Sequence, residues 1–159
     1  MATKTSTSTI EQKLETLVFS ETVQDTFTPD EIALSSMIRN MIADCGGDDQ
    51  PIELFMTGKF NDISDVDMRD FIALWKHATT PAATPVFDKI AVRTIEAQTV
   101  TDKVITKLAD SKSVSSLCKM IVVANFLAIE PLINVYASRL AKIVTRDPEA
   151  FKLAFADSS

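Results

Sequence analysis

The chain has 159 residues, of which 46% are hydrophobic and 24% are charged, a composition typical of one globular domain with a sizeable core. Its net charge of −6, without a cluster of Lys and Arg, argues against nucleic-acid binding, because such a surface repels phosphate backbones. The opening residues MATKTSTST have no apolar h-region, and no apolar run is long enough to cross a bilayer. We therefore expect a disordered N-terminal segment over residues 1–13, no membrane role, and a cytoplasmic and nuclear location.

The first half of the chain mixes short strands and short helices. Residues 14–29 (LETLVFSETVQDTFTP) hold two β-rich runs around a polar SET turn, which predicts a hairpin. Thr28 can cap a following helix that has Pro29 at its first position, and Glu31 can reach back to the N–H of the cap. We expect the helical stretch after Pro29 to break near the two serines at positions 35 and 36.

A short strand and an amphipathic helix are predicted next. PIELFM, residues 51–56, reads as the strand. Residues Ser64 to Ala78 form the helix, with Asp67 as its expected cap and an apolar stripe at helical spacing. That stripe consists of Met68, Phe71, Ile72 and Trp75. TTPAATP, residues 79–85, follows as a linker, because its prolines remove hydrogen-bond donors and disfavour helix just upstream.

The second half is predicted to be helical almost throughout. One helix covers Ser113 to Phe126, and Pro131 begins another. Asp147 and Pro148 then cap a last short helix. The stripe of the Pro131 helix consists of Leu132, Val135, Tyr136, Leu140 and Ile143, and the last helix carries Phe151, Leu153 and Phe155. The order of elements predicts an α+β fold, with helices packed against a small sheet.

No arrangement of residues indicates catalysis, a metal site or a cofactor. His77 is the single histidine, and the nearest acids in the sequence, Asp67 and Asp70, lie two to three turns away, so we interpret it as a solvent-exposed residue at a helix C-terminus. The two cysteines, Cys45 and Cys118, form no CxxC motif and are interpreted as free thiols. We expect no catalytic residue, no metal ligand and no cofactor, and a protein that is not an enzyme.

The C-terminal end is unusually apolar. Phe151 and Phe155 lie in a short tail that has few remaining elements to cover it. Each ring alone is best explained as part of the core. Together with the stripe of the Pro131 helix, the rings indicate an apolar surface kept for a partner.

Several motifs resemble, in matching order, those of the Skp (S-phase kinase-associated protein) adaptors. ANFLAIEPL, residues 124–132, resembles the family's A-A-N-[YF]-L-x-I-x-x-L. TFTPDEIALSSMIRNMIADCG resembles the family's first helical motif, and DDQPIEL resembles its acidic loop and P-[IV]-P-L strand. ISDVDMRDFIALWKHA, PVFDK and RDPEAFKLAF resemble three further family motifs. The resemblance spans residues 14 to 156.

The resemblance implies a BTB/POZ-type fold and a role as adaptor. It assigns residues 14–128 to a BTB/POZ-like domain and 129–159 to a helical region that binds F-box proteins or dimerises. The adaptor would bridge a cullin and F-box substrate receptors in an SCF-type ubiquitin ligase, within the protein degradation pathway. The cullin-binding residues would be Asn125 and Phe126. The F-box-binding residues would be Leu132, Val135, Tyr136, Leu140, Ile143, Phe151 and Phe155.

Departures from the family pattern keep alternatives open. LFMTGKFND (54–62) looks inserted, extra residues lie between PVFDK and VVAN, and we expect the family's final clamp helix to be missing after residue 159. The chain would then be a divergent paralogue. The alternative function is a structural BTB/POZ-type protein that self-assembles and has no cullin role. For Asn125 and Phe126 the alternative is that the asparagine only caps the helix end and the ring belongs to the core.

Overall fold

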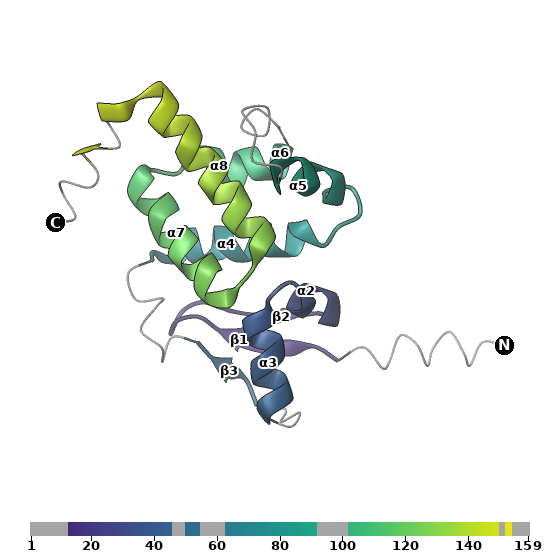
Figure 1. Ribbon diagram of the computed structural model, residues 1–159. Coiled ribbons are helices and arrows are strands. Elements are labelled where there is room, and N and C mark those ends of the chain that lie inside the picture. The colour runs from purple at the N-terminus through teal and green to yellow at the C-terminus, as the bar shows by residue number, and fades with distance from the viewer. Residues whose placement is uncertain (1–12, 46–49, 55–62, 92–101, 150–151, 154–159) are drawn as a thin grey trace.

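A computed structural model describes residues 13–45, 50–54, 63–91, 102–149 and 152–153 of the chain (Figure 1). A small sheet with two short helices beside it forms one layer, and longer helices cover one face of that sheet. Helix α4 lies above the sheet in Figure 1, and helices α7 and α8 cross in front of α4. The predicted α+β class is confirmed.

Within the part of the chain that the structure describes, the sheet has three strands in the order β2-β1-β3. Strands β1 (Glu15–Val18) and β2 (Gln24–Phe27) pair antiparallel, which confirms the predicted hairpin. Strand β3 (Ile52–Glu53) pairs parallel with β1 at the start of the predicted PIELFM strand, and residues 55–56 of that prediction lie outside the described residues. Alternate side chains face the helices, as the period of two in a strand requires. The buried ones are Leu17, Phe19, Val23 and Phe27.

The two helices that follow the hairpin are divided where the double serine predicted. Helix α2 (Pro29–Ala33) begins with the predicted capping box, in which Thr28 and Glu31 each bond the other's backbone N–H. Helix α3 (Ser36–Cys45) begins after the buried Ser35. The Ser35 hydroxyl accepts a hydrogen bond from the N–H of Ile38 and so satisfies a free donor of the first turn of α3.

Helix α4 (Asp65–Ala78) is the central helix of the core. Its cap is Ser64, whose side chain accepts from the N–H of Asp67, so the prediction that Asp67 is the cap was wrong by one helical turn. The predicted stripe is buried, and Trp75 is its largest member. The Trp75 ring packs against three phenylalanines, and its indole N–H donates to the carbonyl of Glu31 at 2.7 Å. Those rings are Phe19, Phe27 and Phe71.

The remaining helices fold over α4. Helix α5 (Thr84–Ala91) follows a turn in the predicted linker, and α6 (Lys103–Ile105) continues into a π-helical turn, η3 (Thr106–Asp110). Helix α7 (Val114–Leu127) has Ser113 as its cap, and α8 (Glu130–Arg146) has Pro131 in its first turn, as predicted. Helix α8 packs against α7 and α5. Beyond α8, residues 148–149 and 152–153 are helical.

A single hydrophobic cluster runs through the described residues and crosses the predicted division at 128/129. Leu127 on one side and Ile129, Leu132 and Val135 on the other are fully buried in it. The first half of α8 therefore completes the core of the preceding elements. The predicted disordered segment, residues 1–13, lies outside the described residues apart from Lys13, as do the acidic residues Asp48 and Asp49 and nearly all of the predicted insertion.

We predict that Trp75→Ala lowers the free energy of unfolding by about 3–5 kcal/mol, because it leaves a large cavity between the sheet and α4 and removes the hydrogen bond from the indole to the carbonyl of Glu31. Urea denaturation followed by circular dichroism measures the change. The control is Val66→Ala in the same helix, because Val66 is 64% exposed. We expect this substitution to alter the free energy of unfolding by less than about 0.5 kcal/mol. Equal effects of the two substitutions would contradict the central position of Trp75.

Candidate protein-interaction site

The end of α7 is closed by backbone hydrogen bonds. Ala128 adopts the left-handed conformation, with φ 57° and ψ 49°, and its N–H bonds to the carbonyl oxygens of Ala124 and Asn125. The N–H of Ile129 also donates to the Ala124 carbonyl, at 3.0 Å. This pattern ends a helix without help from a side chain, and Ile129 is buried beside it. The chain therefore leaves α7 at residue 128, before Pro131 restarts the helical path.

Asn125 lies on the exposed side of this helix end. Its side chain is exposed, and among the described residues it makes no hydrogen bond, so the alternative that it serves as the cap is not supported. Phe126 is half-buried and packs against the hydrophobic core. Val122, one turn earlier, is 53% exposed. We call the surface formed by Val122, Asn125 and Phe126 the α7 face. It is apolar except for the side-chain amide of Asn125.

The predicted F-box-binding residues of α8 fall into two groups. Leu132, Val135 and Tyr136 have no exposed surface, and the Tyr136 ring stacks on Phe71 at 5.9 Å between centroids. The prediction that these three residues bind a partner was wrong for this conformation, because α7, α4 and α5 cover them. These three residues belong to the apolar face of α8 that packs in the hydrophobic core. The helical spacing of apolar residues predicts such a face, but it does not show whether the core or a partner protein buries it.

The second half of α8 is different, because its apolar side chains are only partly covered. Leu140 and Ile143 are half-buried, and Val144 is 36% exposed. Figure 1 shows the end of α8 reaching past α7. We call the surface formed by Leu140, Ile143 and Val144 the distal α8 face. Among the described residues, this face offers accessible apolar surface for the predicted F-box contact. Phe151 and Phe155 lie outside the described residues.

An ion pair of the buried Arg139 marks the change from the covered to the open half of α8. Arg139 is 3% exposed, and its Nε lies 2.5 Å from the carboxylate of Asp110 in η3. A guanidinium that is this deeply buried requires an anionic partner to offset the cost of its desolvation. Sequence reasoning missed this pair, because its two members lie in helices that the pattern of residues does not bring together.

His77 was predicted to be solvent-exposed without a nearby acid, and this prediction was wrong. The His77 side chain is 17% exposed, and its Nε2 lies 3.1 and 3.2 Å from the two carboxylate oxygens of Asp102. Asp102 also caps α6 by accepting from the N–H groups of Val104 and Ile105. Burial alone would raise the pKa of Asp102, but hydrogen bonds from Ile105, His77 and Val104 outweigh it and lower the pKa.

A second charged cluster, also missed by sequence reasoning, ties α4 to the segment before α7. The Lys112 ammonium lies 2.7 Å from Asp67 and 2.6 Å from Asp70. Burial by itself lowers the pKa of Lys112, but the hydrogen bonds to the two carboxylates outweigh it and raise that pKa. The nearby Tyr136 hydroxyl is buried without a hydrogen-bond partner among the described residues, and burial together with these carboxylates raises its pKa.

The charged clusters of the described residues are explained by helix ends and helix contacts. Searched over the same residues, the structure holds no group of three or more His, Cys, Asp or Glu that could bind a metal ion. Cys118 is a free, partly buried thiol whose pKa is raised by burial, and the side chain of Cys45 lies outside the described residues. None of the described helices combines the length and apolar character that crossing a membrane requires.

Comparisons of the chain with models of protein families, with curated proteins and with solved structures found no match.

We predict that Asp102→Asn reduces the acid sensitivity of the fold. Because the folded-state pKa of Asp102 is lowered from 3.8, the stability that its ionised form contributes is present above that value and is lost as the pH falls through the folded pKa. Melting temperatures measured by calorimetry between about pH 7 and pH 2 should therefore fall less steeply in the variant. The control is Asp88→Asn, on the exposed surface of α5, which should follow wild type. Parallel curves for Asp102→Asn and wild type would contradict this assignment.

Proposed function

We propose that this protein is a non-catalytic adaptor of the Skp type, which links a cullin to F-box substrate receptors in an SCF-type ubiquitin ligase. The observation that carries the proposal is the position of the ANFL motif. Its asparagine and aromatic residue lie at the end of α7, with Asn125 exposed and Phe126 half-exposed. The resemblance implies this placement for residues that meet a cullin.

The order of the elements also supports the proposal. Motifs that resemble the family lie, in sequence order, on the α2–α3 pair, strand β3, helix α4, helix α5, and the junction of α7 and α8. In the α7–α8 junction, the left-handed Ala128 and the buried Ile129 hold Asn125 and Phe126 in a defined orientation. A preformed surface of this kind loses little conformational entropy on binding.

The receptor side of the proposal rests on the distal α8 face. Leu140, Ile143 and Val144 leave apolar surface open at the end of α8. The same face favours the alternative function, a self-assembling BTB/POZ-type protein without a cullin. An unfilled apolar face promotes association between copies of a chain. The two functions differ in whether a cullin binds the α7 face.

We predict that the double substitution Asn125→Lys with Phe126→Lys abolishes binding to purified cullin. Two charges at the centre of an interface carry a desolvation cost that the contact cannot offset. Both side chains reach the surface, so we expect the fold to survive, which the circular dichroism spectrum and the melting temperature report. Isothermal titration calorimetry with the cullin N-terminal region measures binding.

The matched control adds the same charge at two other exposed helix positions, Ala33→Lys with Val66→Lys. This control should bind cullin as wild type does. Undiminished binding by the Asn125/Phe126 variant, or no binding by wild type, would contradict the cullin assignment. A variant that unfolds would place Phe126 in the core, and Asn125→Lys alone then tests the surface.

We predict that the wild-type protein forms a weak homodimer through the distal α8 face and that an F-box peptide dissociates it. Leu140→Ser with Val144→Ser should give a monomer, because full burial of each apolar side chain contributes only about 1.5–3 kcal/mol and little else holds the dimer. Phe151→Ser with Phe155→Ser should weaken the dimer in the same way. Sedimentation velocity over a range of concentrations measures the association. A wild type that stays monomeric at high concentration, or a dimer that persists with saturating F-box peptide, would contradict the prediction.

A further inference from the structure

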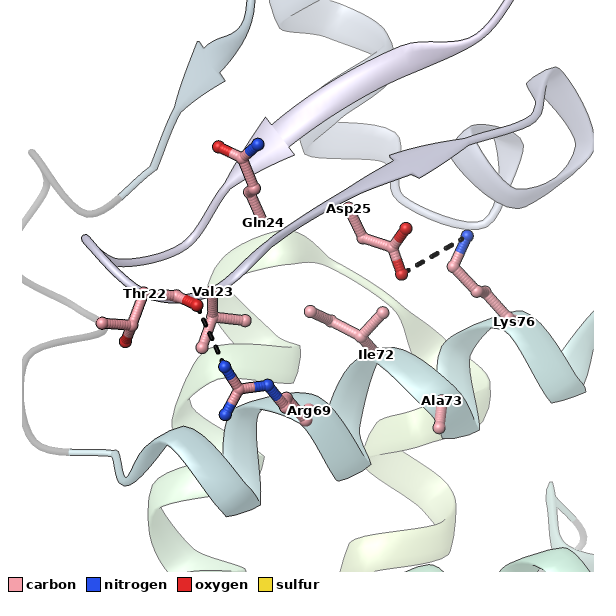
Figure 2. A pocket seen from close by; sticks show the side chains of 8 residues that line it. All are labelled: Thr22, Val23, Gln24, Asp25, Arg69, Ile72, Ala73 and Lys76. Atoms are coloured by element: carbon pink, nitrogen blue, oxygen red, sulfur yellow. Dashed lines mark hydrogen bonds and ion pairs between the residues drawn. The ribbon is translucent and has the colours of Figure 1, made fainter.

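A pocket of about 410 Å³ lies between the hairpin and α4 (Figure 2), and no residue of the α7 face or the distal α8 face lines it. Strand β2 and the residues before it form one wall, and one side of α4 forms the other. Figure 2 shows Val23 and Ile72 on its apolar floor, with Arg69 at one end and Lys76 at the other. The proposed adaptor function uses none of these residues.

Among the described residues, the wall formed by β2 is a free strand edge. In the order β2-β1-β3 of the described strands, β2 has a neighbour on one side only. The N–H of Phe19 donates to the carbonyl of Val23, so this pair is hydrogen-bonded, and pairs along an antiparallel ladder alternate. Val18 and Gln24 therefore form a pair without mutual hydrogen bonds, and the backbone N–H and C=O of Gln24 point away from β1.

The polar groups of this edge are satisfied at both ends and open in the middle. Arg69 donates to the carbonyl of Thr22 at 3.0 Å, and Lys76 donates to the carbonyl of Thr26. The N–H groups of Thr22 and Thr26 are bound by the side chains of Ser20 and Asp25. Among the described residues, the backbone N–H and C=O of Gln24 have no partner. An edge group in this state is a template for one residue of another extended chain.

The two basic residues at the ends of the pocket are not equivalent. The Lys76 ammonium lies 3.2 Å from Glu31 and 3.9 Å from Asp25, so two carboxylates offset its charge. Arg69 is exposed and uses one guanidinium N–H for the carbonyl of Thr22, which leaves donors of its fork for an anion. The open cation of the pocket is therefore at the Arg69 end.

We propose that this pocket binds an extended acidic segment of a partner protein, which adds one residue to the edge of β2. In an antiparallel arrangement that residue exchanges two hydrogen bonds with the backbone of Gln24. Its two neighbours point toward α4, because side chains alternate along a strand. The neighbour on the N-terminal side is apolar and covers Ile72 and Ala73. The neighbour on the C-terminal side carries a carboxylate that pairs with Arg69.

The test uses the full chain, labelled with ¹⁵N, and an end-blocked pentapeptide of threonine, isoleucine, threonine, glutamate and threonine. We expect saturable shifts of the Gln24 amide and of the Arg69 side-chain N–H, with a dissociation constant of about 1 mM. A peptide with glutamine in place of glutamate should bind roughly fivefold more weakly, since an exposed ion pair contributes little more than that. A peptide with an N-methyl group on its central threonine lacks the donor to the Gln24 carbonyl and should not bind.

Matched variants of the protein assign the contacts. Arg69→Gln should remove the preference for glutamate over glutamine, and Gln24→Pro should abolish binding, because proline removes the N–H but is tolerated at an outward-facing edge position. Arg39→Gln makes the same charge change on the exposed surface of α3 and should bind as wild type does. A glutamate preference that survives Arg69→Gln, an N-methylated peptide that binds normally, or the absence of saturable shifts at Gln24 would overturn the proposal. The N-methylated peptide tests the backbone hydrogen bond to Gln24 without any change to the protein. It therefore keeps the proposal testable even if Gln24→Pro does not fold.

Discussion

The Trp75 indole joins three parts of the molecule that lie far apart in the sequence. Its ring lies 4.4 Å from that of Phe27 in β2 and 6.5 Å from those of Phe19 and Phe71, measured between centroids. Its N–H is held by the carbonyl of Glu31 near the end of α2. The indole ring gains most from burial in the hydrophobic core, but its N–H then needs a hydrogen-bond acceptor at the edge of that core. The carbonyl of Glu31 provides this acceptor. The sheet, the α2–α3 pair and the central helix α4 are therefore fixed relative to one another at this residue.

A second tie connects this half of the molecule to the helices that carry the candidate site. The buried Ser35 hydroxyl donates to the carbonyl of Leu127, the last residue of α7, while it accepts from the N–H of Ile38. One hydroxyl thus satisfies the start of α3 and the end of α7 together. The end of α7 cannot rotate without breaking this bond or the turn at Ala128. The positions of Asn125 and Phe126 consequently depend on the packing of the first half of the chain.

Helix α8 serves the core with one half and leaves the other half open. Its first turns bring Leu132, Val135 and Tyr136 into the same cluster as the residues of α4 and α7. After the ion pair of Arg139 with Asp110, the side chains of Leu140, Ile143 and Val144 are only partly covered. A helix anchored in this way holds its open end rigidly with respect to the sheet. Such an anchored apolar end suits the proposed adaptor, which must hold a receptor at a fixed orientation from its other partner.

Features that depend on neighbouring residues were predictable from the sequence. The capping box of Thr28 and Glu31, the hairpin around SET, the stripe of α4 and the start of α8 near Pro131 all follow from interactions within a few positions. Features that depend on distant residues were decided by the tertiary structure alone. Asp102 lies 25 positions from His77, and Lys112 lies 45 positions from Asp67, so no local pattern joins them. The α8 stripe has the same period whether a partner or the core covers it, and only the packing of α4, α5 and α7 decided that Leu132, Val135 and Tyr136 are core residues.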